Sequence, residues 1–595
     1  MMGGGYSPPT LELGDVKHAG QVEPGSFFQR ITGGVKTGII LKDVSFATNS
    51  GEVTAILGSK GSGKRALLDV IARRVPSQGH IMLEGVPLQE DQFNSTCALV
   101  RHSTRLLPGL SVQQTLSLSL TKISGYLKQS KVKQVMADLA LSQVAHKCVT
   151  NLTKSEYRRL VIGLQLIRDP IILLLDEPTW DLDPLNTYLV ISILSNAAKT
   201  YGTSIILTME KPRSVCLSTV DRRSRERFIE SNQQIEALVE KFKIEGHAIM
   251  QGNLHESRIM NPNKMQMNYG KPSGVSIIWM LYARMLASIF NLKKNGVKQM
   301  FMRLFTLPLY FLILWIFYNE AQDYQRAFIT KSGLIFNAMV GVYFISIMNT
   351  ICLYGPYRTR YYQESQEGLY SGASLLLAWN LVSLPFSFIT CFGSAAIVYP
   401  ILSDITETVD FVYFALVLWS CYIYAEQQSL AIMMLVKNGL IAAMVNIYIT
   451  CVYVMLASGV LRSYKGYEEW LYYITYITHT RYASIYLHRS VFKQQTFNIL
   501  PFSDHENCTS ITNLIQTSSS LSTNSNSNCR YASGKAFLSE RFTAKSFNGA
   551  LDQSGEFNLE FNLGISFAFS AGIMVFNKFL YLIPLPGYIT DKFRE

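Results

Sequence analysis

The chain is 595 residues long, carries a formal net charge of +12 at pH 7 and has a mean hydropathy of +0.15. This length exceeds one ordinary domain. The average hydropathy hides two halves: residues 1–274 are mixed and charged, whereas residues 275–595 contain long apolar runs. No RNA- or DNA-binding motif is present, and cytosolic Lys and Arg of a membrane protein explain the charge better. We therefore expect no nucleic-acid partner.

Residues 1–30 are rich in Gly, Pro and polar residues, which predicts a flexible N-terminus. No apolar segment of the kind that signal peptides carry follows Met1. We therefore expect the N-terminus and the first half of the chain to lie in the cytosol.

A glycine-rich loop separates a strand-like run, residues 52–57, from a helix-like run, residues 66–72. This context is typical of a phosphate-binding loop, because glycines let successive N–H groups point at phosphate oxygens and the helix dipole attracts the anion. We expect Lys64 to reach the outer phosphates. The motif has Ser or Thr after the lysine, whose hydroxyl binds magnesium, but Arg65 occupies this position. The predicted nucleotide-binding residues are Gly58, Ser59, Lys60, Gly61, Ser62, Gly63, Lys64 and Arg65.

An all-apolar run, residues 171–175, ends in Asp176 and Glu177. Such a run is typical of a central parallel strand that delivers carboxylates at its C-terminal end. We predict that Asp176 binds Mg²⁺ and that Glu177 is the catalytic residue, polarising the attacking water. Each motif alone has a simpler explanation. The loop could be an ordinary glycine-rich turn, and the apolar run could be a buried strand followed by polar residues. Together they predict a P-loop ATPase that uses ATP and Mg²⁺, with metal binding weakened by Arg65.

Several stretches resemble one family. Residues 176–183 resemble the Walker B motif and D-loop of an ATP-binding cassette, and residues 157–170 resemble the helix after its signature, with the arginine-rich turn of subfamily G. In the second half, residues 363–370 and 384–387 resemble the sterol branch of the subfamily G half-transporters. The resemblance covers nearly the whole chain from about residue 38 onward.

Compared with that family, the nucleotide site departs at several further positions. His102 falls where the family has the Q-loop glutamine. The signature falls on residues 152–156, so Thr153 and Ser155 are degenerate motif positions, and Ser155 replaces a glycine that allows close backbone approach. Glu210 falls on the switch histidine, which puts an acid where the family has a γ-phosphate partner.

The nucleotide-binding domain, residues 31–220, lacks part of its expected C-terminal end. Residues 208–214 resemble the end of the switch strand, and residues 217–223 already resemble the linker beyond the domain. The family has several tens of residues between them. A skipped exon or an imperfect gene model explains this better than an evolved short cassette, and either way the domain loses part of its core.

Residues 221–274 are charged or polar and predict a linker, and residues 275–595 predict an ABC-2 type transmembrane domain. It begins with an amphipathic connecting helix, residues 275–291. A large extracellular loop is expected at residues 462–560. Six apolar runs are each long enough to cross a hydrocarbon core of about 30 Å, near residues 299–318, 333–354, 373–402, 409–435, 439–461 and 561–583.

Glu426 lies inside the fourth apolar run. An intramembrane acid is costly and is a functional candidate by default. Two interpretations stay open: Glu426 relays between the membrane core and the cassette side, or it pairs with a polar neighbour such as Gln427 or Tyr424.

The predicted extracellular loop contains Cys508 and Cys529 within a polar stretch, where they could form a disulfide in an oxidising compartment. Asn507 begins an Asn-Cys-Thr glycosylation sequon. We expect both modifications if the loop is extracellular.

The predicted fold is an incomplete α/β P-loop nucleotide-binding domain followed by an all-α polytopic membrane domain. The resemblance implies an ATPase-type translocase with a degenerate site, in a half-transporter that exports sterols or similar lipids. It also implies an obligate dimer with a second subfamily G half-transporter, the other sterol half-transporter, in the plasma membrane with a cytosolic N-terminus. The alternative is a non-catalytic or regulatory membrane subunit that pairs with a catalytic half-transporter.

Overall fold

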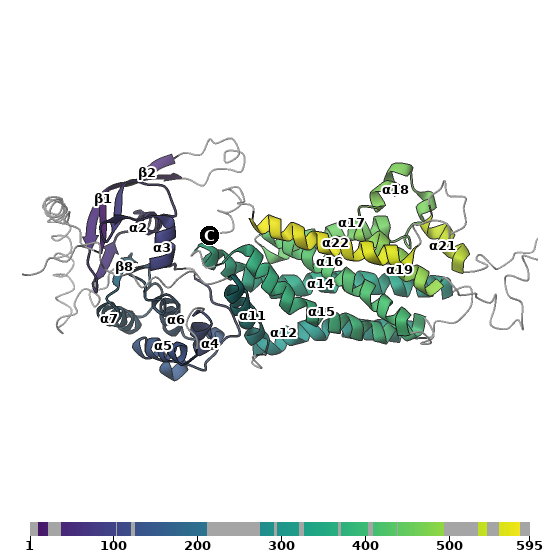
Figure 1. The fold of residues 1–595 in the computed structure, drawn as a ribbon, viewed down its shortest axis with the longest axis horizontal. Coiled ribbons are helices and arrows are strands. Elements are labelled where there is room, and N and C mark those ends of the chain that lie inside the picture. The colour runs from purple at the N-terminus through teal and green to yellow at the C-terminus, as the bar shows by residue number, and fades with distance from the viewer. Residues whose placement is uncertain are drawn as a thin grey trace, which may run out of the picture. The chain divides into compact units, whose positions relative to one another are not determined.

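A computed structural model describes residues 10–21, 37–102, 104–120, 125–210, 274–290, 294–319, 327–366, 370–402, 408–436, 438–492, 534–543 and 558–582. The chain forms two compact units (Figure 1). The first unit spans 1–288 and 359–371, and the second spans 289–358 and 372–595. The linker residues 221–273 and the sites at Asn507, Cys508 and Cys529 lie outside the described residues.

The first unit contains two four-stranded sheets. One is antiparallel with the order β2-β1-β4-β5, formed by Thr37–Thr48, Leu11–Gln21, Gln78–Leu83 and Val86–Pro87. The other is parallel with the order β3-β8-β7-β6, formed by Val53–Leu57, Ser204–Met209, Ile172–Leu175 and Cys97–Val100. Strand β7 is the predicted central apolar strand, and all four of its residues are fully buried.

Strand β1 lies within residues 1–30, which the sequence predicted to be flexible. Its side chains Leu11, Leu13 and Val16 are fully buried. The register shifts between Leu13 and Val16, next to Asp15, which has a positive φ of 51°. This irregularity breaks the period-two alternation that identifies a strand in a sequence.

The helices of the first unit begin where the sequence supplies caps. Ser111 and Thr153 each form a capping box at the start of α4 (Val112–Ser117) and α6 (Lys154–Leu166). Asp183 caps α7 (Pro184–Tyr201), which has proline at its first position. The other described α-helices are α2 (Lys64–Ile71), α3 (Glu90–Thr96), α5 (Gly125–Asp138) and most of α11 (Gly274–Phe290).

The second unit is helical. Its described elements are α12 (Lys294–Leu304), α13 (Thr306–Tyr318), α14 (Ala327–Gln366), α15 (Gly372–Leu402), α16 (Thr408–Leu435), α17 (Gly439–Ala457), α18 (Glu469–Thr475), α19 (His479–Phe492), α21 (Gly534–Phe542) and α22 (Leu559–Leu582). The last turns of α14 belong to the first unit.

Four described helices, α14, α15, α17 and α22, are long and apolar enough to cross a membrane. A fifth span is possible if α12 and α13, which bend by 42° at their junction, are counted together. Helix α16 matches the fourth predicted run but is not among these spans. Its consecutive polar residues Glu426, Gln427 and Gln428 lower its hydropathy.

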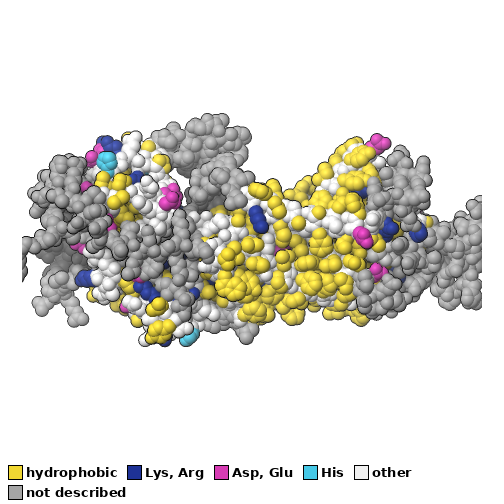
Figure 2. All heavy atoms as spheres, in the orientation of Figure 1, with side chains coloured by type: hydrophobic (Ala, Val, Ile, Leu, Met, Phe, Trp, Pro, Cys, Tyr) yellow, Lys and Arg dark blue, Asp and Glu magenta, His cyan; other side chains and the backbone are white. Residues whose placement is uncertain are grey.

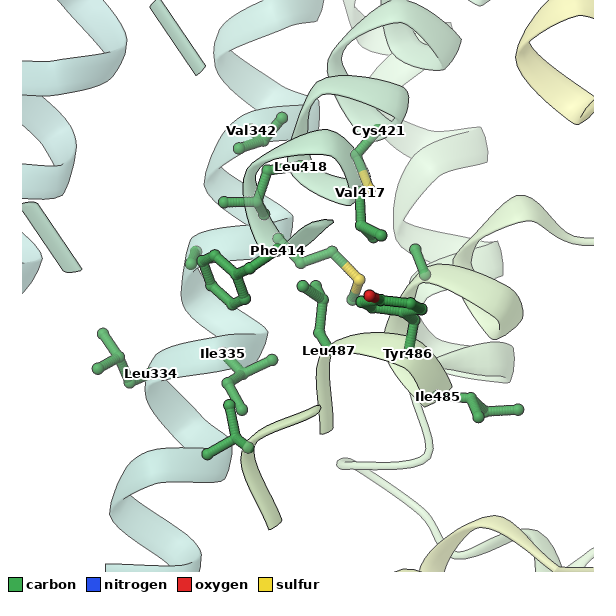
Figure 3. Close-up of a cluster of buried hydrophobic side chains, with 14 of the residues drawn as sticks. Leu334, Ile335, Val342, Phe414, Val417, Leu418, Cys421, Ile485, Tyr486 and Leu487 are labelled. Atoms are coloured by element: carbon green, nitrogen blue, oxygen red, sulfur yellow. The ribbon is translucent and has the colours of Figure 1, made fainter. Parts of the chain in front are cut away.

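The core of the second unit is formed by side chains from α14, α16 and α19, among them Ile335, Val342, Phe414, Leu418 and Leu487 (Figure 3). On the surface, hydrophobic side chains gather over the helices of this unit on the face in view (Figure 2). Helix α13 exposes Leu309, Ile313 and Ile316, and α17 exposes a similar apolar set. An apolar exterior around a polar-containing interior is the arrangement that a lipid environment favours.

Candidate functional site

The four parallel strands place the predicted nucleotide residues at one edge of the sheet, because parallel strands end on the same side. The glycine-rich loop follows β3, His102 follows β6, and the two carboxylates follow β7. They line a pocket of about 380 Å³ whose wall is formed by Lys60, Gly61, Gly63, Lys64, Arg65, Ala66, His102, Asp176 and Glu177.

The loop after β3 needs glycine at defined places. Gly61 and Gly63 have φ values of 86° and 87°, in the left-handed region that favours glycine. A Cβ on Gly58 would lie 2.5 Å from Ser62 Oγ, so this position also excludes a side chain unless Ser62 moves. The backbone of this loop therefore depends on glycine at these three positions.

Lys64 is 8% exposed and begins α2. Its ammonium donates hydrogen bonds to the carbonyl oxygens of Gly58, at 2.6 Å, and Ser59, at 2.9 Å. The same Nζ lies 3.9 Å from Glu177 Oε1. The loop therefore wraps around a buried positive charge at the wall of the pocket.

Thr208, near the end of β8, connects the two carboxylate residues. Its hydroxyl donates to Asp176 Oδ1 at 3.2 Å and accepts from the Glu177 backbone N–H at 3.0 Å. Thr208 is fully buried, and Glu177 has a positive φ of 45°. Sequence analysis gave Thr208 no role. A hydroxyl residue at the end of the strand beside β7 is the signal that could have found it.

The residues of the pocket do not fit the magnesium site that its motifs imply. A nucleotide-bound magnesium ion in such loops takes a loop hydroxyl and the acid of the neighbouring strand. Here Arg65 stands in place of the hydroxyl. Asp176 accepts the Thr208 hydroxyl with one of its carboxylate oxygens.

Three of the degenerate motif positions, Thr153, Ser155 and Glu210, are not part of the pocket wall. Thr153 caps α6, with its hydroxyl accepting the Glu156 N–H at 3.3 Å. Ser155 is 5% exposed, and its hydroxyl has no hydrogen-bond partner in the described structure. Glu210 follows β8 directly but does not line the pocket. His102 does line it, edge-on to Trp180 at 5.8 Å between ring centroids.

Two family models match the chain: ABC transporter over residues 41–180, and ABC-2 type transporter over residues 277–488. The chain belongs to the ABC transporters. It is 26% identical to ATP-binding cassette sub-family G member 5 of Mus musculus over 508 residues, covering 75% of this chain and 77% of the relative. It is 25% identical to ABC transporter G family member 4 of Arabidopsis thaliana over 483 residues, covering 75% and 82%. The predicted resemblance to subfamily G is confirmed.

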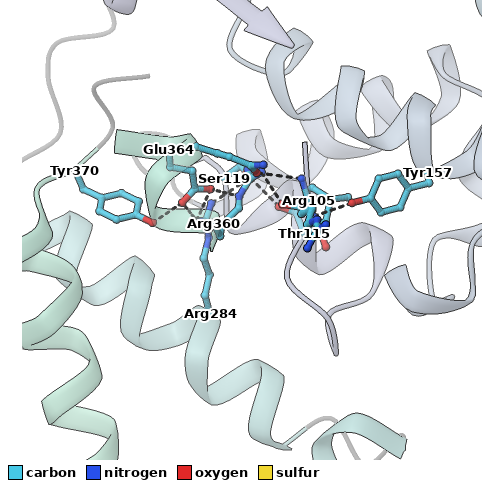
Figure 4. A network of polar contacts seen from close by, with 10 residues as sticks. Arg105, Thr115, Ser119, Tyr157, Arg284, Arg360, Glu364 and Tyr370 are labelled. Atoms are coloured by element: carbon cyan, nitrogen blue, oxygen red, sulfur yellow. Dashed lines mark hydrogen bonds and ion pairs between the residues drawn. The ribbon is translucent and has the colours of Figure 1, made fainter. Parts of the chain in front are cut away.

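This ABC transporter chain has a second polar site within the first unit (Figure 4). Glu364, near the end of α14, is 1% exposed. It accepts two hydrogen bonds of 3.0 Å from Arg284 of α11, one of 2.7 Å from Arg360 and one of 2.7 Å from the Tyr370 hydroxyl. Burial and the adjacent carboxylate raise the pKa of Tyr370 well above its usual value, so this phenol remains a donor.

The network continues into the nucleotide-binding domain. Arg360 donates to the Arg105 carbonyl oxygen at 3.2 Å, and the Arg105 N–H donates to Gln363 Oε1 at 3.0 Å. The Tyr157 hydroxyl donates to the Thr104 carbonyl oxygen at 3.2 Å. Neither Arg360 nor Arg284 was among the residues singled out from the sequence. The apolar context of Arg284 and the acid within 363–370 were the available signals.

In the second unit, Glu426 is 2% exposed and pairs with α15. It accepts hydrogen bonds from Trp379 Nε1 at 2.7 Å and Ser383 Oγ at 2.5 Å. The Arg303 guanidinium lies 4.9 Å from the centroid of the Trp379 ring. The partners are thus not the predicted neighbours Gln427 and Tyr424 but residues of another helix.

Proposed function

We propose that this chain is one half of an ATP-dependent exporter of sterols or similar lipids. The observation that carries the proposal is the Arg284–Glu364–Arg360 cluster. Its ion pairs join α11 to the end of α14, and Arg360 also donates a hydrogen bond to the Arg105 carbonyl oxygen of the domain that contains the nucleotide pocket. A movement of that domain on nucleotide binding would be transmitted to a membrane helix through these contacts.

A second half-transporter of subfamily G is the proposed partner. Each nucleotide in such a transporter is enclosed between the phosphate loop of one chain and the signature of the other. Helix α7 exposes Leu185, Tyr188 and Leu189, which lie one helical turn apart, and Trp180 just before it is 47% exposed. Exposed apolar side chains beside a nucleotide pocket suit a protein interface.

We place this exporter in the plasma membrane with its nucleotide-binding domain in the cytosol, where ATP is available. Lys293, Lys294 and Lys298 before the first span, and Arg358 and Arg360 after the second, support this orientation.

A non-catalytic membrane subunit is the second candidate. Arg65 in place of the magnesium-binding hydroxyl favours it, as does Ser155 in place of the signature glycine. In this role the chain completes or regulates a catalytic partner.

Transport by reconstituted vesicles separates the two candidates. This chain is co-purified with a subfamily G half-transporter, and ATP-dependent uptake of radiolabelled cholesterol is compared with that of the partner alone. We expect uptake only by the pair, and its loss in Glu364→Gln. Equal uptake by the partner alone would assign this chain a regulatory role.

A further inference from the structure

We propose that the pocket after β3 binds a nucleoside triphosphate that carries no magnesium ion, with the Arg65 guanidinium supplying the compensating positive charge. This inference rests on nucleotide binding by the proposed half-transporter. It concerns the chemical form of the ligand, which the family resemblance does not give.

The charges that line the pocket favour an uncomplexed polyphosphate. Lys60, Lys64 and Arg65 face it from one short segment, against the two carboxylates Asp176 and Glu177. The Lys64 ammonium already lies 3.9 Å from Glu177, which partly neutralises that carboxylate. Lys60 and Arg65 are both exposed, and neither forms an ion pair with a carboxylate of the described residues. Two cations therefore remain for phosphate oxygens.

Arg65 is placed to bind phosphate. It is the second residue of α2, whose first N–H groups also point outward toward the loop. A guanidinium has five N–H donors in a planar fork and can bind two phosphate oxygens at once. A divalent ion at the position of the missing hydroxyl would be repelled by this fixed cation.

The acidic side of the pocket offers a magnesium ion few protein ligands. The Thr208 hydroxyl points its proton at Asp176 Oδ1, 3.2 Å away, and so occupies one lone pair of the carboxylate. Thr208 is fully buried and is held in place by the Glu177 N–H at 3.0 Å. With the loop hydroxyl absent, Asp176 would have to bind magnesium without the second protein ligand that such ions take in these loops.

The test uses the full chain in lipid nanodiscs without any transport substrate. Titration calorimetry measures the affinity for ATP in EDTA and in excess Mg²⁺, for wild type and for Arg65→Thr, which restores the hydroxyl. We expect wild type to bind ATP at least as tightly in EDTA as in Mg²⁺. The variant should bind at least tenfold more weakly in EDTA and regain affinity when Mg²⁺ is added.

Two controls define the result. Lys133→Thr removes an exposed cation of α5 that does not line the pocket and should change neither affinity. Inorganic phosphate should bind far more weakly than ATP. The proposal is overturned if wild type loses tenfold or more of its affinity in EDTA, if Arg65→Thr has no effect, or if phosphate competes as well as ATP. Failure of cholesterol transport would leave the measured metal dependence unchanged, so the two proposals are tested separately.

Discussion

The Glu364 carboxylate is buried and accepts hydrogen bonds from three side chains. The carboxylate compensates the buried guanidiniums of Arg284 and Arg360, which are 6% exposed each. In Glu364→Gln both cations would remain buried without an anion, which costs about 3–5 kcal/mol. We therefore expect a large fall in the thermal midpoint of the purified chain, monitored by intrinsic fluorescence.

The matched control is Asp43→Asn, which also removes one carboxylate from an ion pair. Asp43 pairs with Lys17 at 2.8 Å, but both side chains are at least 40% exposed. Exposed pairs contribute little, so this variant should keep the wild-type midpoint. Similar midpoints for Glu364→Gln and Asp43→Asn would show that the buried cluster does not hold the unit together.

The Thr208 hydroxyl makes two hydrogen bonds between β8 and the carboxylate residues after β7. Thr208→Val keeps the shape of the side chain but leaves the Glu177 N–H without its acceptor, at a cost of about 1–3 kcal/mol. Denaturant unfolding should show this loss. Thr208→Ser keeps the hydroxyl and should retain most of the stability, whereas equal losses in both variants would point to packing rather than hydrogen bonding.

Individual residues could be predicted from the sequence where they belong to a short motif. The positions of Lys64, Asp176 and Glu177 follow from a loop and a strand end, and the structure brings them to one pocket with His102. The hydrogen-bond partners of Thr208 and Arg284 could not be predicted, because they are distant in sequence and only the tertiary fold brings them together.

Among the elements, β3 and β7 have different surroundings in the parallel sheet. Strand β7 lies between β6 and β8, whereas β3 borders only β8 among the described strands. All four residues of β7 are fully buried, and Leu57 of β3 is 39% exposed. A backbone amide hydrogen exchanges with solvent when its hydrogen bond opens locally, and such opening is easier in a more exposed strand.

We expect the β3 amides to exchange markedly faster than those of β7 when the full chain is followed by hydrogen–deuterium exchange mass spectrometry. Adding ATP should slow exchange in the loop after β3 and leave β7 unchanged. Equal protection of both strands without nucleotide would mean that another part of the chain covers the free edge of β3.

Element types were predictable where the apolar pattern was long and regular, as in α14, α15, α17 and α22. The observed elements differ from the predicted ones at two places, and each difference has a physical cause. Strand β1 is interrupted by a bulge, so its pattern does not alternate. The first predicted span is divided at Phe305 into α12 and α13, because Pro308 has no N–H to donate to the carbonyl of Leu304 at the end of α12.

For the whole molecule, the proposed orientation predicts that Asn507 is glycosylated and lies on the opposite side of the membrane from the nucleotide pocket. Glycosidase should increase the gel mobility of wild type, and Asn507→Gln should migrate like the deglycosylated form. In intact cells a tag at residue 1 should be inaccessible. Unchanged mobility of wild type together with an accessible N-terminal tag would refute the orientation.

We expect this chain to bind nucleotide but to contribute little hydrolysis, because positioning and electrostatic stabilisation carry nearly all of phosphoryl transfer. Arg65 replaces the magnesium-binding hydroxyl, Ser155 replaces the signature glycine, and Glu210 replaces the switch histidine, so each substitution removes one group that would position or stabilise the phosphates. The direct measurement is vanadate-sensitive ATP hydrolysis in lipid, by this chain alone and with its partner, for wild type and Lys64→Met. We predict negligible hydrolysis by this chain alone, and hydrolysis by the pair that survives Lys64→Met. Robust hydrolysis by this chain alone that Lys64→Met abolishes would contradict the account.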